Sequence, residues 1–96
     1  KLLLSQNSKN ILLIDVRNPI EQNEYSVLGS KLVPLNTIES GEAINKIKMF
    51  ATEKQLYIFC KSGNRSLRAI KHLKKYGINS INVEGGLEAW KKEKIE

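Results

Sequence analysis

The run of apolar residues at positions 10–16 constrains the fold more than any other feature of the sequence. After Asn10, it contains a single charged residue, Asp15. A strand with one face in solvent alternates apolar and polar residues, whereas a strand covered on both faces is apolar almost without interruption. Strands of the second kind belong to parallel sheets that are buried between other layers. We therefore predict a buried strand in a mostly parallel sheet.

The rest of the chain alternates between strand and helix patterns. Further strands are predicted at residues 31–35, 55–60 and 78–83. Apolar residues at helical spacing, with proline, serine or glycine at the expected ends, predict four helices. The first covers residues 21–25 after Pro19, and the second opens at Ser40-Gly41 and carries Ile44, Ile47 and Phe50. The third has Ser66 as N-cap and Gly77 as C′ residue, with Leu67, Ile70, Leu73 and Tyr76 on one face. The last follows Gly85-Gly86 and carries Leu87 and Trp90. The alternation predicts an α/β domain with a central, mostly parallel sheet flanked by helices.

Length and cysteine content limit the classes of protein. Ninety-six residues are enough for one domain with a single core. Cys60 is the only cysteine, so the chain has no internal disulfide, which fits a reducing compartment such as the cytoplasm and excludes a two-cysteine oxidoreductase. One cysteine and one histidine, His72, are too few for a structural zinc site. The longest apolar runs span only a few residues, so no membrane span is predicted.

Cys60 lies between a predicted strand and a predicted helix, a position that favours a reactive cysteine. The first N–H groups of a helix have no partner within the helix, and together with the helix dipole they favour a thiolate over a thiol. Gly63 allows the backbone to curl, and Arg65 adds a permanent cation that can face the sulfur or an incoming anion. We predict a surface loop that cradles an anion, with Cys60 as the catalytic nucleophile. The loop residues are Cys60, Lys61, Ser62, Gly63, Asn64, Arg65 and Ser66.

The alternative for Cys60 is a structural role as a small apolar residue buried at the end of a strand. Such a residue does not need the glycine, the cations and the serine that follow it here. Asp15 and Arg17 end another predicted strand and are expected near the loop as supporting residues. In that role Asp15 accepts backbone N–H groups and Arg17 pairs with a carboxylate such as Glu24. His72 is expected at the edge of the polar helix face, too far from Cys60 for a catalytic pair.

Four short motifs, taken in order, resemble those of the rhodanese-like sulfurtransferases. The most specific of them is the loop that opens with Cys60 and closes with Arg65 ahead of a serine. The resemblance covers nearly the whole chain and implies a three-layer α/β fold. It also implies that Cys60 carries sulfur as a persulfide and that residues 61–65 cradle the terminal sulfur. No metal or cofactor is expected. The other motifs are Ile14-Asp15-Val16-Arg17, then Glu24-Tyr25 with Gly29-Ser30 and Leu32-Val33-Pro34-Leu35, then Val83-Glu84-Gly85-Gly86 with Trp90.

A finer resemblance concerns residues 34–42 and 83–86, which are similar to the C-terminal rhodanese domain of fused adenylyltransferase–sulfurtransferases. Those proteins activate a ubiquitin-like sulfur-carrier protein for molybdopterin or thiolation pathways. The resemblance implies thiosulfate or a persulfide-bearing protein as sulfur donor and a sulfur carrier as acceptor. We also expect residues 1–96 to be a single domain of a longer chain, because the sequence starts at Lys1 and contains nothing of an adenylating domain.

Two other function classes remain open. Cysteine-dependent phosphatases and arsenate reductases also close a cysteine loop with arginine. The related phosphatase loop, however, has one more residue than the four between Cys60 and Arg65, and it suits a larger anion. Some rhodanese-like domains are interaction modules that have lost the cysteine, whereas this chain keeps Cys60, Gly63 and Arg65.

Positive charge is concentrated around the predicted loop. In a chain of net charge +6, residues 54–83 carry seven cations and no acidic residue. Such a field attracts anionic substrates or an acidic protein partner, although the cations are also compatible with a solvated helix face. Aromatic residues are not interleaved with the cations, so a nucleic-acid partner is not expected. The seven cations are Lys54, Lys61, Arg65, Arg68, Lys71, Lys74 and Lys75.

Overall fold

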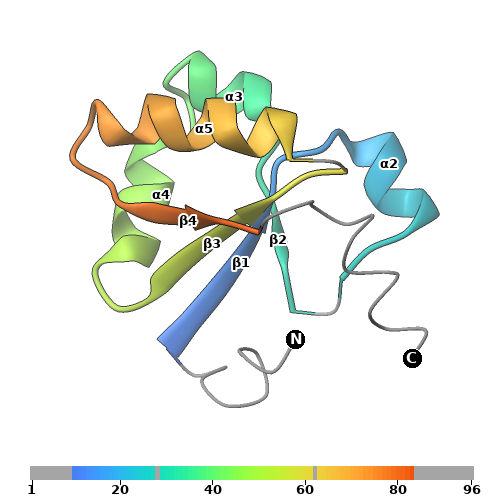
Figure 1. Ribbon diagram of the computed structural model, residues 1–96, viewed down its shortest axis with the longest axis horizontal. Helices are drawn as coiled ribbons and strands as arrows, with labels where there is room; N and C mark the ends of the chain where they lie inside the picture. The colour runs from blue at the N-terminus through green and yellow to red at the C-terminus, as the bar shows by residue number, and fades with distance from the viewer. Residues whose placement is uncertain (1–9, 28, 62, 84–96) are drawn as a thin grey trace.

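The computed structural model describes residues 10–27, 29–61 and 63–83, and the strands among them form one parallel sheet. The sheet order is β2-β1-β3-β4, and each neighbouring pair is parallel (Figure 1). This confirms the predicted α/β architecture with a parallel sheet. The strands are β1 (Ile11–Asp15), β2 (Lys31–Leu32), β3 (Gln55–Phe59) and β4 (Ser80–Asn82).

The strand order places β1 and β3 side by side in the centre of the sheet. Asp15, the last residue of β1, lies opposite Phe59, the last residue of β3. The N–H of Val16 then donates to the carbonyl of Phe59 at 3.0 Å. Ligands of open parallel sheets bind at the carboxyl ends of the strands. The segments that follow β1 and β3, including Cys60, therefore meet at the edge where a site is expected.

Three helices pack on one face of the sheet. These are α3 (Leu35–Glu39), α4 (Ile44–Ala51) and α5 (Asn64–Lys74), and all three share a buried core with the strands. Figure 1 shows α3 and α5 next to each other, and α2 (Pro19–Glu24) at the end of the molecule where β1 and β3 finish. The opposite face carries a smaller cluster, which consists of Leu13 and Phe59 with Tyr25, Val27, Tyr57 and Val83.

The two clusters explain why β1 is apolar without interruption. Successive side chains of a strand point to opposite faces of the sheet. Leu12 and Ile14 accordingly enter the main core beneath the three helices, while Leu13 enters the smaller cluster. All three are buried. The strand predicted from residues 10–16 is thus covered on both sides, as its composition indicated.

The segment after β2 differs from the prediction. Residues 31–35 do not form one strand, because β2 ends at Leu32 and Pro34 is the N-cap of α3. The fixed φ of proline suits the start of a helix. Ser40 ends α3 as its C-cap, and Gly41 with φ +91° separates α3 from α4. The predicted helix that carries Ile44, Ile47 and Phe50 is present as α4, but its predicted start at Ser40 is wrong, and α3 was not foreseen.

The start of α5 also differs from the prediction. Its N-cap is Gly63, and Ser66 lies inside the first turn, so the prediction of Ser66 as N-cap is wrong. At the other end, Gly77 has the left-handed conformation expected of a C′ glycine (φ +77°), although the helix itself ends with Lys75 as C-cap. The predicted last helix, residues 85–90, lies outside the described residues. No helix in the described part of the chain is long and apolar enough to span a membrane.

Candidate active site

Cys60 follows β3 directly, and its sulfur lies beneath the first turn of α5. The Sγ atom accepts hydrogen bonds from the backbone N–H of Gly63 at 3.0 Å and from that of Ser66 at 3.4 Å. Two N–H donors and the positive end of a helix stabilise a thiolate relative to a thiol. The sulfur therefore has the donors that a thiolate nucleophile requires.

The prediction that Cys60 lies in a surface loop is wrong, because its side chain is only 1% exposed. The cause is the alternation of side chains along β3. Phe59 points into the smaller cluster, so Cys60 points to the other face and joins the main core beneath α5. Burial by itself disfavours a charged sulfur. A structural role accounts for this burial, but it does not account for the two N–H donors directed at the sulfur.

Gly63 makes the approach of these donors possible. Its φ of 110° lies in the left-handed region, where a residue with a Cβ atom is strained. This conformation turns the chain back under α5, so that the N–H of Gly63 points at Sγ while Gly63 caps the helix. The predicted curl of the backbone at Gly63 is therefore present.

Ser66 closes the site from the first turn of α5. The side chain is fully buried, and its hydroxyl donates to the carbonyl of Gly63 at 2.9 Å. The hydroxyl also contacts Oδ1 of Asn82, the last residue of β4, and lies 3.7 Å from the Sγ of Cys60. Sequence reasoning missed Asn82, because a single asparagine at the end of a short strand gives no signal of its own.

Arg65 forms a bidentate ion pair with Glu21 of α2. Its Nη1 donates to Oε1 of Glu21 at 2.7 Å, and its Nη2 donates to Oε2 at 2.9 Å. These bonds raise the pKa of Arg65, as do attractions to Cys60 and Asp15, while desolvation opposes the rise. The same pair holds the pKa of Glu21 at about 2. The cation expected to face the sulfur is thus bound to a carboxylate that sequence reasoning missed.

Asp15 and Arg17 support the site from the end of β1. Both are buried, and Nε and Nη2 of Arg17 donate to the Asp15 carboxylate at 2.8–3.2 Å. The carboxylate also accepts the backbone N–H of Arg17 at 3.0 Å, as predicted. Arg17 then donates to the carbonyls of Glu21 and Tyr25, which ties α2 to the sheet. The expected carboxylate partner, Glu24, is wrong: the partner is Asp15.

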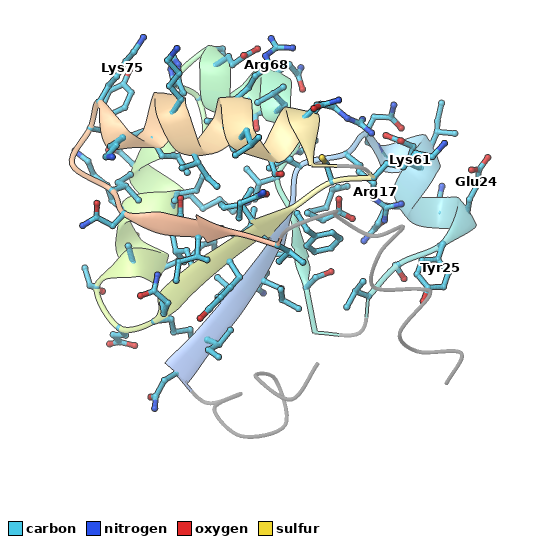
Figure 2. The ribbon with its side chains drawn as sticks, in the orientation of Figure 1. Arg17, Glu24, Tyr25, Lys61, Arg68 and Lys75 are labelled. Atoms are coloured by element: carbon cyan, nitrogen blue, oxygen red, sulfur yellow. The ribbon has the colours of Figure 1, made fainter. Side chains whose placement is uncertain are left out.

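The remaining predicted loop residues are less enclosed. Lys61 and Asn64 are exposed, and Figure 2 shows Lys61 at the same end of the molecule as Arg17. Ser62 lies outside the described residues. His72 lies in the last turn of α5, about 12 Å along the helix axis from its first residue. Among the described residues, no three His, Cys, Asp or Glu side chains could hold a metal ion.

A surface cavity of about 290 Å³ adjoins Arg65. It lies between the segments that follow β1 and β2 and the start of α5, with Asn18, Leu35 and Glu39 among the residues that line it. Arg68 also lines the cavity, and its Nη2 donates to Oε2 of Glu39 at 2.7 Å. Arg17 lines it too, so all three arginines of this cavity are paired with carboxylates. The two that lie within residues 54–83, Arg65 and Arg68, are paired with Glu21 and Glu39. The excess of cations counted for residues 54–83 is reduced by these two acids, which come from distant parts of the sequence.

The parallel sheet and the buried cysteine under a helix N-terminus together define an α/β domain in which two backbone N–H groups donate to the sulfur of one cysteine. The chain belongs to the family of rhodanese-like domains, which matches residues 1–93. This agrees with the resemblance carried by the loop and the three other motifs.

Similar proteins support the same assignment. A probable adenylyltransferase/sulfurtransferase, MoeZ of Mycobacterium tuberculosis, is 33% identical over 88 residues, which cover 91% of this chain but 22% of MoeZ. A probable molybdopterin-synthase adenylyltransferase of Pyropia yezoensis is 35% identical over 91 residues, 95% of this chain and 23% of that protein. The crystal structure of a rhodanese-related protein from Thermoplasma volcanium has a TM-score of 0.76 at 32% identity and covers 94% of this chain and 85% of that one. The chain thus spans less than a quarter of the two curated relatives.

Proposed function

We propose that the domain is a sulfurtransferase in which Cys60 accepts a sulfane sulfur as a persulfide and passes it to an acceptor. The observation that carries this proposal is the pair of backbone N–H groups, from Gly63 and Ser66, that donate to Sγ at 3.0 and 3.4 Å. They stabilise negative charge on the sulfur that attacks and on the sulfur that leaves. Membership of the rhodanese-like family and the name of the MoeZ relative support the same reaction.

The proposed reaction has two displacements and needs one cysteine. The Cys60 thiolate attacks the outer sulfur of thiosulfate, an S–S bond to Cys60 forms, and the S–S bond of thiosulfate breaks as sulfite leaves with the electron pair. A nucleophilic acceptor, such as a thiolate or cyanide, then attacks the terminal sulfur of the persulfide. The new bond forms as the persulfide S–S bond breaks, and Cys60 leaves as a thiolate. The cycle has no net oxidation and no cofactor.

We also propose roles for the supporting residues, a sulfur donor and acceptor, and a cellular setting. Asp15 and Arg17 would support the loop from below without touching the reacting sulfur. The names of the relatives point to a sulfur-carrier protein as acceptor, and a persulfide-bearing protein is the proposed donor. We further propose a cytoplasmic setting, in which a free thiol is maintained. Residues 1–96 are proposed to be one domain of a longer protein.

Selectivity for sulfur over phosphate tests the proposal against phosphatase chemistry. After incubation with thiosulfate, the intact mass of the parent domain is expected to increase by one sulfur atom. An aryl phosphate is expected to be hydrolysed far more slowly than sulfur is transferred to cyanide, because the short loop encloses a sulfur atom and not a tetrahedral phosphate. Faster turnover of the phosphate than of thiosulfate would assign the domain to the other enzyme class.

The outer face of α5 is proposed to attract the acidic partner. Lys71, Lys74 and Lys75 are exposed there, and Figure 2 shows Lys75 and Arg68 directed away from the sheet. Reversal of all three lysines to glutamate is expected to slow sulfur transfer to an acidic sulfur-carrier protein by roughly tenfold at low salt, because charge steering acts on association. Transfer from thiosulfate to cyanide should change much less. Stopped-flow rates at several salt concentrations measure both effects.

A matched control uses three exposed lysines on other elements. Lys31, Lys46 and Lys48 lie on β2 and α4, and their reversal changes the net charge by the same amount. If both triple variants slow the protein acceptor equally, steering depends on net charge and α5 is not the docking face. If neither does, the lysines of α5 are simply a solvated helix surface.

A further inference from the structure

The ion pair between Glu21 and Arg65 is more ordered than a chance surface contact. The Glu21 side chain is held independently of Arg65, because it belongs to a capping box. Its Oε1 accepts the N–H of Asn18 at 3.1 Å, and its own N–H donates to Oδ1 of Asn18 at 2.9 Å. Both terminal nitrogens of Arg65 then bind the two carboxylate oxygens. The capping box thus orients the Glu21 carboxylate, and this orientation fixes the geometry of the ion pair with Arg65.

The helix that carries Glu21 is itself anchored. Arg17, held by Asp15, donates to the carbonyl of Glu21 at 3.3 Å and to that of Tyr25 at 2.6 Å. Carbonyls within and just beyond α2 are thus bonded to a buried side chain at the end of β1. The position of the Glu21 carboxylate beside the cysteine loop is therefore set by the sheet, and not by the rotamer of a free surface residue.

The pair also sets the charge around the sulfur. Arg65 is the loop cation that attracts the charge of Cys60, yet its guanidinium is neutralised by Glu21. Arg68, which lines the adjoining cavity together with Arg65 and Arg17, is neutralised by Glu39. A small dianion that approaches Arg65 or Arg68 therefore meets a carboxylate as well. The side chains of Arg65 and Glu21 are 33% and 24% exposed, so solvent and small anions reach the pair.

We propose that Glu21 is a specificity-determining residue of this site: by engaging Arg65, it disfavours small dianionic donors such as thiosulfate relative to donors that carry less negative charge, such as a persulfide on a thiol. The proposal rests on the proposed sulfurtransferase function. It predicts that neutralising Glu21 releases the Arg65 cation toward an incoming anion. Glu21→Gln is the suitable change, because the amide oxygen can still accept the N–H of Asn18. Glu24→Gln is the matched control, since it removes the same charge from an exposed residue of the same helix.

The first test measures access of charge to the sulfur and does not require sulfur transfer. Cys60, the only cysteine, is alkylated with iodoacetate, which is anionic, or with iodoacetamide, which is neutral, and the adduct is followed by intact mass. The ratio of the two rates cancels changes in thiolate content and in loop opening. Glu21→Gln is expected to raise this ratio roughly three- to tenfold at low salt, because it removes one negative charge that is paired with the loop residue Arg65. Glu24→Gln should leave it unchanged.

The second test uses thiosulfate as donor and cyanide as acceptor. Glu21→Gln should lower the KM for thiosulfate by a similar factor, with kcat within about twofold of the parent value. The Arg65→Met variant should have a low alkylation ratio, because the Glu21 carboxylate is left without its counter-charge. Adding Glu21→Gln to it should restore part of the ratio, but the double variant should stay below Glu21→Gln alone, which keeps the Arg65 cation. An unchanged ratio in Glu21→Gln, or a rise in KM, would overturn the proposal. A raised ratio in a domain that forms no persulfide would instead refute the sulfurtransferase function alone.

Discussion

The Cys60→Ser variant is expected to form no persulfide and to transfer no sulfur. Serine keeps the size of the side chain and can accept the N–H of Gly63, but its hydroxyl is not ionised near neutral pH and does not attack a sulfane sulfur. Intact mass after thiosulfate treatment should show one added sulfur atom in the parent and none in the variant. Because the cysteine is the only one in the chain, no other residue can replace it. Sulfur transfer by the variant at the parental rate would exclude Cys60 as the nucleophile.

The burial of Cys60 makes a stability control necessary. A side chain that is 1% exposed and packed in the main core is not free to change without cost. Cys60→Ala should lower the free energy of unfolding by roughly 0.5–3 kcal/mol, the usual range for a single core change. Urea unfolding of both variants separates this loss from the loss of activity. A folded Cys60→Ser domain without activity is the result that supports the proposed chemistry.

The Asp15→Asn variant is expected to be strongly destabilised. The change leaves the guanidinium of Arg17 buried without its counter-charge, with side-chain exposures of 5% for Arg17 and 0% for Asp15. Removal of one partner of a buried ion pair costs about 3–5 kcal/mol, out of a total that is roughly 5–15 kcal/mol for a domain of this kind. Urea unfolding monitored by far-UV circular dichroism measures the loss.

An exposed ion pair provides the comparison for Asp15. Glu39→Gln breaks the pair between α3 and Arg68, whose side chains are 36% and 63% exposed, and should change the free energy of unfolding by about 1 kcal/mol or less. Combining Asp15→Asn with Arg17→Met removes both buried charges and should recover part of the stability. Equal losses for Asp15→Asn and Glu39→Gln would show that the buried pair does not support the fold.

The sequence predicted the sheet and the place of the cysteine because both depend on local patterns. Burial of a strand on both faces leaves a continuous apolar run, and such a run is visible at residues 10–16 without any knowledge of the partner strands. The position of Cys60 between a strand and a helix follows from the order of two such patterns. The predicted helix boundaries were wrong where a single residue sets the start of the helix: Pro34 is the N-cap of α3, and Gly63 is the N-cap of α5.

The partners of the charged residues were less predictable. Asp15 and Arg17 lie two residues apart, yet the prediction paired Arg17 with a carboxylate such as Glu24 and assigned only backbone N–H groups to Asp15. Glu21 and Arg65 are separated by 44 residues, and no periodicity connects them. Such a contact depends on how the loops cross the end of the sheet, which is a property of the assembled fold. The charge of a segment, counted along the sequence, therefore overstated the field around the loop.

The central position of β1 and β3 ties the chemistry of the sulfur to the completion of folding. Parallel neighbours cannot be joined by a tight hairpin, so β3 reaches β1 only after the intervening segment has crossed over. Contacts of this kind form slowly, because a large loop must close before they are made. Until then, Cys60 has neither a helix above it nor fixed N–H donors, and it behaves as an ordinary thiol. In a chain still being synthesised, Cys60 would thus be a less activated thiol, and the proposed loading of sulfur would favour finished domains.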